Sequence, residues 1–380
     1  MAKNFDICIR GAGIVGLSLA LHLAAKQLRV ALVADETPAT SDVRAYALNL
    51  VSRELLESVR CWPDDEHATA VLSMQVQTAD GGYVAFSATE QGAPALNWIV
   101  DVPVLESRLR EAVRFQPLIE VVDAPRDATL TIVCEGRASR SREEFGVDWE
   151  ATPYGQSALA TRIHCSKTHE QVALQWFDRG EILAFLPLDG PQGSQCAVVW
   201  SVSPARAQQL QSAPDAEFCQ HLETASHGRM GSITLAGVRN VWPLQQAQAK
   251  RWIGASDKGS WVLAGDAAHN MHPLAGQGLN VGLADVMELV RVLTTKTSWR
   301  ELDDHRLLRQ YERARKAEFA LMGQANDALQ QLFTQDHPGL RALRNWGMNQ
   351  FERSGSIKHW VARRAMGASS SQPPHRKASS

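Results

Sequence analysis

Apolar positions near the start of the chain follow the order of a strand, a helix and a second strand. FDICIR at residues 5–10 is a short β-rich run, and RVALVA at residues 29–34 is another. Between them, GAGIVG at residues 11–16 leads into LSLALHLAAKQ, whose apolar positions have helical spacing. The pattern predicts a β–turn–α–β unit within about 30 residues.

A second strand–loop–helix pattern lies at residues 262–285, VLAGDAAHNMHPLAGQGLNVGLAD. The apolar run 261–264 breaks at Gly265 and Asp266, and the loop that follows contains Pro273, Gly276 and Gly278. Apolar residues then recur at helical spacing, at Leu279, Leu283, Val286, Met287, Val290 and Leu293. An acid, close backbone approach at glycines and a helix N-terminus together favour a polar, electron-rich ligand. An ordinary βα connection is the alternative.

The middle of the chain has three β-rich runs bounded by glycine and proline. They are QVALQWF at 171–177, EILAFLPL at 181–188 and QCAVVWSV at 195–202. This pattern predicts an antiparallel sheet. Trp176, Phe185 and Trp200 are expected to face an interior, either a core or a substrate cavity, and a core is the simpler interpretation for each. From residue 305 the pattern becomes helical and basic.

Composition narrows the class of protein. The 380 residues suffice for two or three cores, and 44% hydrophobic with 21% charged residues is an ordinary globular balance. A net charge of −2 gives no field that would recruit nucleic acid. No apolar stretch approaches the roughly 20 residues needed to cross a bilayer. We found no signal-peptide pattern, and therefore expect a cytoplasmic protein with reduced thiols. The cysteines are spread without metal-binding spacing, so no metal site is expected: Cys8, Cys61, Cys134, Cys165, Cys196 and Cys219.

The glycine-rich turn is a dinucleotide fingerprint in its proper context. Gly11 permits the tight turn, Gly13 lets backbone approach a pyrophosphate, and Gly16 lets the helix pack on the strand. A plain glycine-rich βα turn is the alternative. The chain has no second GxGxxG.

Two positions beside this fingerprint are unusual. An acid normally ends the second strand and holds a ribose, but Ala34 stands there and Asp35 follows it. We take Asp35 as the ribose candidate. Arg10 ends the first strand where an apolar residue is usual, and it either approaches a pyrophosphate or emerges into solvent.

GxGxxG together with GDAAHNMHPLAGQGLNVGLAD resembles the FAD-dependent aromatic hydroxylases of the p-hydroxybenzoate hydroxylase type. The chain is more similar to the ubiquinone-biosynthesis hydroxylase branch, whose members often carry HPxxGQGLNxGLxD. The resemblance runs through nearly the whole chain, because four further segments occur in the expected order: 41–62, 95–109, 183–190 and 311–319.

The resemblance implies an α/β fold. A doubly wound GxGxxG-type FAD-binding domain would carry an inserted antiparallel β-sheet substrate domain and C-terminal helices. The expected discontinuous FAD-binding domain comprises residues 1–70, 100–155 and 240–304. The expected substrate domain comprises 71–99 and 156–239. A C-terminal helical region at 305–367 and a disordered tail at 368–380, rich in Ser, Pro and Lys, would follow.

The resemblance also assigns roles. Gly11, Gly13 and Gly16 would hold the ADP pyrophosphate, Arg44 would lie near the flavin and phosphates, and Asp266 after Gly265 would accept from the ribityl side. The isoalloxazine would be lined by Pro273, Gly276, Gln277, Gly278, Leu279 and Asn280. Arg44 as a surface ion pair and Asn280 as an N-cap are the alternatives. His269 and His272 are better interpreted as loop-stabilising residues than as acid–base groups.

Four positions depart from the family pattern, all on the ADP side. The second fingerprint of the family, an Asp-Gly pair before Ser and Arg, here reads CEGRASRSR at 134–142, with Glu135 in place of Asp. Pro103 stands where relatives often place an FAD-contacting arginine, and Arg10 and Ala34 are the other two. We therefore expect FAD binding with modified adenosine and pyrophosphate contacts.

The implied activity is that of an FAD-dependent monooxygenase. NAD(P)H would be a transient reductant, O₂ would form a flavin C4a-hydroperoxide, and an aromatic ring would be hydroxylated. Because the flavin carries the difficult step, no catalytic side chain is nominated. The expected substrate is a polyprenylated phenol or quinol precursor of ubiquinone. A hydroxylase of soluble aromatics and a non-catalytic scaffold are the alternatives.

The basic, aromatic segment 344–367 bears on where such an enzyme would work. It mixes arginine and lysine with Trp346, Phe351 and Trp360, a composition typical of a membrane interface. A packed helix with a solvated basic face fits equally well. Peripheral membrane contact, or membership of a biosynthetic complex, is therefore compatible with the sequence.

Overall fold

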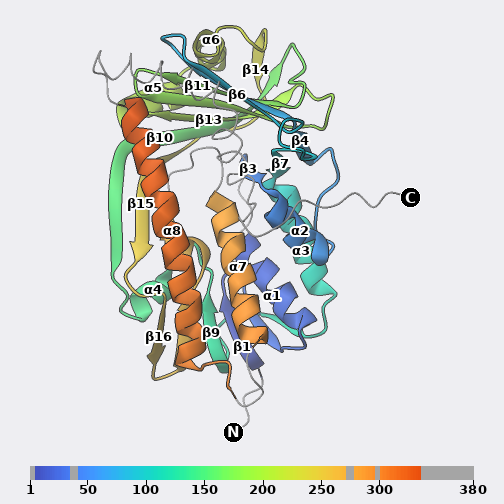
Figure 1. The fold of residues 1–380 in the computed structure, drawn as a ribbon, viewed down its shortest axis with the longest axis vertical. Helices are drawn as coiled ribbons and strands as arrows, with labels where there is room; N and C mark the ends of the chain where they lie inside the picture. The colour runs from blue at the N-terminus through green and yellow to red at the C-terminus, as the bar shows by residue number, and fades with distance from the viewer. Residues whose placement is uncertain (1–4, 35–41, 271–277, 296–299, 335–380) are drawn as a thin grey trace.

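The computed structural model describes residues 5–34, 42–270, 278–295 and 300–334, with side chains to residue 324. A parallel sheet forms the lower half of Figure 1, in the order β16-β17-β9-β1-β2-β8. Its strands are β1 (Phe5–Arg10), β2 (Val30–Val33), β8 (Ile119–Val122), β9 (Ala128–Val133), β16 (Ile253–Ser256) and β17 (Gly259–Leu263). Among the described strands of this sheet, β16 alone pairs antiparallel.

The predicted β–turn–α–β unit is confirmed and lies at the centre of this sheet. Helix α1 (Ile14–Ala25) joins β1 to β2, and β1 lies between β2 and β9 with Ile7 opposite Val30 and Leu130. The chain winds outward from β1 in both directions. Such a reversal point opens a ligand crevice at the carboxyl ends of the strands.

A small antiparallel sheet and several helices flank the parallel sheet. The small sheet has the order β3-β7-β4, with β3 at Ala45–Leu48, β4 at Ala68–Val71 and β7 at Asn97–Asp101. Helices α1 and α7 (Gly278–Thr294) lie together over the parallel sheet (Figure 1). The other helices of this half are α2 (Leu50–Ser58), α3 (Val102–Arg114) and the short α4 (Arg140–Glu144).

A larger sheet covers the top of the molecule, in the order β18-β15-β10-β13-β12-β11-β5-β6, with β14 also pairing with β10. The three predicted central strands are confirmed as β11 (Val172–Asp178), β12 (Glu181–Pro187) and β13 (Gln195–Val202). The others are β5 (Ser73–Thr78), β6 (Tyr83–Ser87), β10 (Trp149–Cys165), β14 (Ile233–Leu235), β15 (Asn240–Ala249) and β18 (His269–Asn270). The sheet is mostly antiparallel as predicted, but β11 pairs parallel with β5 because β5 arrives from an earlier segment of the chain.

The two faces of the larger sheet have different partners. Cys196, Val198 and Trp200 on β13 belong to a core with α5 (Pro204–Ser212) and α6 (Asp215–Ala225). Ala197 and Val199 alternate with them and face the opposite side. Trp176, Phe185 and Trp200 all belong to the core under α5 and α6, so the interpretation of these aromatics as core residues is correct.

Two long elements connect the halves of the molecule. Strand β10 extends along the edge of both halves, paired with β15, so β15 belongs to the larger sheet although it begins the segment 240–304. Helix α8 (His305–Thr334) lies beside these strands (Figure 1). Of the helices the structure describes, none combines the length and apolarity needed to cross a membrane. Residues 335–367 of the predicted C-terminal helical region, and the predicted tail 368–380, lie outside the described residues.

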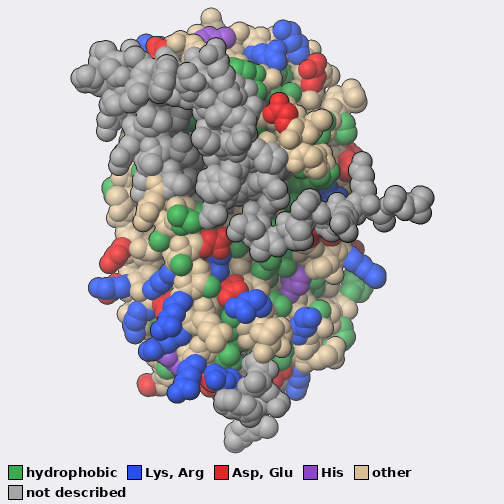
Figure 2. Space-filling model, in the orientation of Figure 1, with side chains coloured by type: hydrophobic (Ala, Val, Ile, Leu, Met, Phe, Trp, Pro, Cys, Tyr) green, Lys and Arg blue, Asp and Glu red, His purple; other side chains and the backbone are tan. Residues whose placement is uncertain are grey.

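Charge is mixed on the outside of the molecule. On the face in Figure 2, basic and acidic side chains both occur over the lower half, where α7 and α8 lie. This agrees with the net charge of −2.

Candidate functional site

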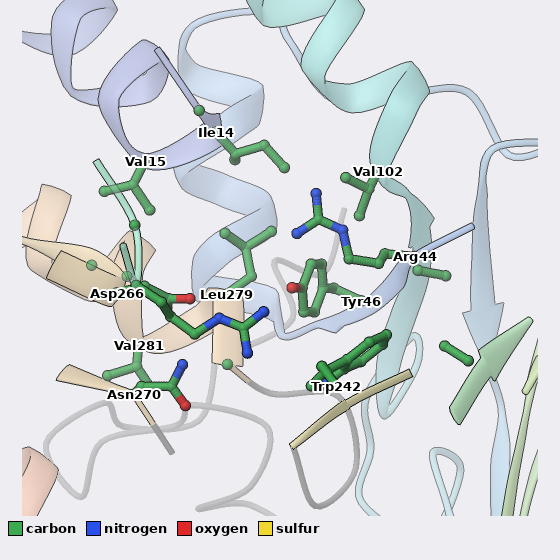
Figure 3. Close-up of a pocket in the computed structure, with 18 of the residues that line it drawn as sticks. Ile14, Val15, Arg44, Tyr46, Val102, Trp242, Asp266, Asn270, Leu279 and Val281 are labelled. Carbon is green, nitrogen blue, oxygen red and sulfur yellow. The ribbon is translucent and has the colours of Figure 1, made fainter. Parts of the chain in front are cut away.

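A cavity of about 350 Å³ opens between the parallel sheet and the larger sheet. On the parallel-sheet side it is lined by the glycine turn before α1, the loop after β17 and the start of α7. Strands β10, β13 and β15 line the other side, and β3 closes a flank. Figure 3 shows Arg44, Tyr46, Trp242 and Asp266 around this space. The cavity occupies the crevice that the winding of the parallel sheet predicts.

The glycine turn is shaped by close backbone contacts. Gly11 has φ +108, and a Cβ on it would lie 2.5 Å from the Cys134 carbonyl oxygen. A Cβ on Gly16 would lie 1.9 Å from the Gly11 carbonyl oxygen. By contrast, a Cβ on Gly13 would meet no atom within 4 Å, because Gly13 borders the cavity. The backbone is thus open to a ligand at Gly13 alone of the three.

The N-terminus of α1 points its unpaired amides at the same space. Gly13 is its N-cap and supplies no side-chain acceptor. Free amides and the helix dipole favour an anion at this position.

The loop after β17 carries an acid into the cavity. Gly265–Ala267 form one turn of 3-10 helix, and Gly265 has φ +60. The Asp266 carboxylate faces the cavity space, but surrounding protein still desolvates it and raises its pKa. His269, Arg137 and Arg44 oppose that shift electrostatically. In Figure 3, Asp266 and Tyr46 point toward one another from opposite walls.

A buried ion network holds this loop from behind. The Asp285 carboxylate on α7 accepts from the Gly265 amide at 2.8 Å and from Arg315 Nε at 2.7 Å, and it lies 2.6 Å from His269 Nε2. Burial by itself would raise the pKa of Asp285, but His269 and Arg315 outweigh it and hold the pKa below its usual value. The His269 ring also contacts Trp252, at 4.8 Å between centroids. This supports the interpretation of His269 as a loop-stabilising residue.

Arg44 directly precedes β3 and Tyr46 lies within it, and both side chains line the cavity. The Arg44 guanidinium donates to both Asp42 carboxylate oxygens, at 2.9 and 2.7 Å, and this pairing raises its pKa. Burial raises the pKa of Tyr46, so its hydroxyl is a neutral donor at physiological pH. Arg44 has the ion pair of the alternative interpretation, and it also lines the cavity.

The Asn280 side chain forms hydrogen bonds that differ from both roles we considered, lining the isoalloxazine and capping a helix. Its Oδ1 accepts from the Asn49 amide and the Ser52 hydroxyl, and its Nδ2 donates to the Ala47 carbonyl. The side chain therefore ties α7 to β3 and α2. It neither caps its own helix nor borders the cavity, whereas Gly278 and Leu279 do border it.

Arg10 follows neither of the two courses we considered. It is buried, and it donates to Ser141 and pairs with Glu144 on α4, beside the Phe145 ring. The Glu135 carboxylate is likewise satisfied nearby, because it accepts from the Ser139 hydroxyl and from the amide and hydroxyl of Ser141. These two departures from the family pattern form one local scaffold under α4.

The structure brings together most of the predicted site. Residues bordering the cavity, with those packed directly behind them, are Gly11, Gly13, Gly16, Arg44, Gly265, Asp266, Gly278 and Leu279. Asp35, Pro273, Gly276 and Gln277 lie outside the described residues, as does His272. Pro103 is the second residue of α3, in the first helical turn, where a proline is tolerated.

The sequence reasoning missed many of the residues that line the cavity, among them the polar or aromatic side chains of Tyr46, Arg137 and Trp242. Tyr46 could have been found, because it is two residues after Arg44 in a β-rich run and so shares its face. Arg137 and Trp242 carry no comparable local signal.

The wall formed by the larger sheet, hereafter the sheet wall, has a distinct chemistry. Its described residues carry no charge: Ala160, Ala197, Val198, Val199, Trp242, Pro243, Leu244 and Gln245. Small side chains on β10 and β13 leave room, and Trp242 offers a ring face. The sheet wall is suited to an uncharged aromatic group.

The residues present fit FAD. Gly13 and the α1 N-terminus offer a cradle for a diphosphate, and the Asp266 carboxylate is available to accept from hydroxyl groups. The start of α7 at Gly278 places a second helix N-terminus at the cavity. The apolar sheet wall then leaves space for a ring system and a substrate.

Comparison with known proteins agrees with this geometry. The family model described as FAD binding domain matches residues 122–324, more than half of the chain, and the chain belongs to this family. A second model, FAD dependent oxidoreductase, matches residues 6–99. The predictions of FAD as cofactor and of the monooxygenase class are confirmed.

Particular relatives cover almost the whole chain. The 3-demethoxyubiquinol 3-hydroxylase of Escherichia coli (strain K12) is 29% identical, over 95% of this chain and 98% of that protein. The ubiquinone hydroxylase UbiL of Rhodospirillum rubrum is 29% identical, over 96% and 90%. The structure of p-nitrophenol 4-monooxygenase PnpA from Pseudomonas putida DLL-E4 superposes with a TM-score of 0.77 at 17% identity, over 97% and 99% of the two chains. The predicted fold class is confirmed.

Proposed function

We propose that this protein is an FAD-dependent monooxygenase that hydroxylates the ring of a polyprenylated phenol or quinol in ubiquinone synthesis. The carrying observation is the single cavity that joins a dinucleotide cradle to an uncharged sheet wall. The names of the two bacterial relatives support the substrate class. The described residues of the sheet wall include no cation that could pair with a carboxylate, so this wall suits a substrate ring that carries none.

The chain's own residues would position and desolvate the reactants. When bound, FAD supplies the oxygen chemistry. The glycine turn would hold its diphosphate, and the start of α7 would stabilise negative charge on the flavin ring. Tyr46, whose hydroxyl stays protonated, can donate a hydrogen bond into the cavity. The sheet wall would exclude water from the reacting ring.

Two measurements test the proposal together. Purified protein should show a flavin absorption spectrum, and a strain lacking the gene should accumulate an unhydroxylated quinone precursor. Normal quinone content in that strain would rule out the pathway. Colourless protein that stays colourless with added FAD would instead indicate a scaffold. Simple phenols that stimulate NAD(P)H oxidation without lipid or detergent would indicate a hydroxylase of soluble aromatics.

The sheet wall gives a sharper prediction. Replacing Ala197 with Leu should leave FAD content unchanged, because Ala197 lies across the cavity from the glycine turn. The added side chain takes up ring space, so kcat/KM for the aromatic substrate should fall about tenfold or more. Ala197→Ser, which adds little volume, is the control. Unaltered kcat/KM in Ala197→Leu would place the substrate elsewhere.

Contact with a membrane belongs to the same proposal. A polyprenylated substrate partitions into lipid, so we propose that the protein binds the bilayer surface peripherally or within a biosynthetic complex. Co-flotation of the full chain with vesicles of anionic lipid tests this. Protein that stays at the bottom of the gradient, with and without substrate, would contradict direct membrane binding.

A further inference from the structure

Arg137 is a cation that borders the cavity without a partner. Its side chain lines the cavity together with Gly13, Gly136 and Asp266. Within the described part of the chain, its guanidinium makes neither a hydrogen bond nor an ion pair. Arg137 helps to lower the pKa of Asp266 through its charge, but the structure gives no ion pair between the two side chains. A cation left unpaired beside a ligand cavity is available to an anionic ligand.

The turn that carries Arg137 is fixed at both ends. Gly136 has φ +79, and Glu135 before it is held by Ser139 and Ser141. The buried Arg142 donates to the Arg137 carbonyl at 2.7 Å. These contacts order the turn without using the Arg137 side chain. That side chain is therefore not needed for the local structure.

Arg142 also connects this turn to the opposite loop. Its other nitrogen donates to the Ala267 carbonyl at 3.1 Å, and its guanidinium lies 3.8 Å from the Trp149 ring centroid. The turn that presents Arg137 and the turn that presents Asp266 are therefore held by one buried side chain. Their spacing around the cavity is built in before any ligand binds.

The position of Arg137 selects the kind of anion. Gly13 and the uncapped N-terminus of α1 border the same cavity and favour a phosphate group. Arginine recognises phosphate oxygens with paired N–H groups. The acid that begins the family's second fingerprint is Glu135 here, and it already accepts hydrogen bonds from Ser139 and Ser141.

We propose that Arg137 is a ligand of the FAD diphosphate and strengthens a cofactor site in which four ADP-side positions depart from the family pattern. The inference rests on FAD binding, part of the proposed function. It adds a residue to the site that neither the glycine fingerprint nor the loop after β17 contains.

The test is flavin affinity measured on the apoprotein. Titration followed by flavin fluorescence should give a dissociation constant for FAD that is about 10- to 100-fold higher in Arg137→Ala, as expected for lost hydrogen bonds to a charged group. Arg137→Lys should recover part of the affinity. Riboflavin, which has no phosphate, should bind wild type and Arg137→Ala equally.

Arg140 provides a matched control, because it is an exposed arginine on the same segment and does not line the cavity. Arg140→Ala should bind FAD like wild type. Equal FAD affinity in wild type and Arg137→Ala would overturn the inference, as would an equal loss for riboflavin, which would indicate a structural effect. A raised KM for NAD(P)H at unchanged FAD affinity would assign Arg137 to the reductant and also overturn it. Wild type that binds no FAD would instead defeat the proposed function itself.

Discussion

Replacing Asp285 with Asn is expected to lower the free energy of unfolding by about 3–5 kcal/mol, the usual cost of breaking a buried ion pair by removing one partner. Asp285 is fully buried and serves Gly265, His269 and Arg315 at once. The amide of asparagine keeps the shape of the side chain but carries no charge. The buried Arg315 guanidinium would therefore lose the negative charge that faces its Nε. Urea denaturation followed by tryptophan fluorescence measures the change.

Glu288 on the same helix is the matched control. It pairs with Arg291, whose side chain is 55% exposed, so Glu288→Gln should cost at most about 1 kcal/mol. Because Asp285 anchors the loop at Gly265, Asp285→Asn should also weaken FAD binding, whereas Glu288→Gln should not. Equal losses of unfolding free energy in the two variants would show that the buried network stabilises the fold no more than the surface ion pair does.

The Asp285 effect should depend on pH in a defined direction. The folded pKa of Asp285 is lowered, so its stabilisation is complete above the unfolded pKa of about 3.9 and is lost as pH falls through the folded pKa. The difference between wild type and Asp285→Asn should therefore be constant near neutrality and shrink under strong acid. A difference that grew on acidification would contradict the ionised state of Asp285.

Local patterns were sufficient to predict the parts of the site that depend on neighbours in sequence. GAGIVG between two β-rich runs predicted β1, α1 and β2, because turn, helix and strand signals all lie within one unit. The apolar spacing after Leu279 predicted α7, although Met287, assigned to its apolar stripe, is 38% exposed. In the structure these elements place Asp266 and Gly13 around one cavity.

Arg10 and Asn280 show what local patterns cannot supply. Arg10 was expected at a pyrophosphate or in solvent, but its partners Ser141 and Glu144 belong to a segment far along the chain. Asn280 likewise reaches Ala47 and Ser52 across the fold. Burial of a polar side chain depends on which groups the fold brings within hydrogen-bonding distance, and no periodicity encodes that.

Gly16→Ala and Gly13→Ala are expected to fail in different ways, although both alter the same fingerprint. A Cβ at Gly16 would lie 1.9 Å from the Gly11 carbonyl oxygen, and two backbone segments would have to separate. We expect a loss of about 3 kcal/mol or more in the free energy of unfolding, because this contact cannot be relieved by a flexible side chain. Denaturation of the apoprotein measures it.

Gly13→Ala should leave the fold nearly intact. Gly13 has φ −80, which alanine adopts freely, and its Cβ would meet no atom within 4 Å. The expected stability cost is at most about 1 kcal/mol, since alanine is a poorer N-cap than glycine. The new methyl group projects into the cavity where the backbone would meet the diphosphate, so FAD affinity should fall about tenfold or more while riboflavin affinity changes less. Wild-type FAD affinity in Gly13→Ala would mean that the diphosphate does not approach this turn, and the assignment of the glycine cradle would be wrong.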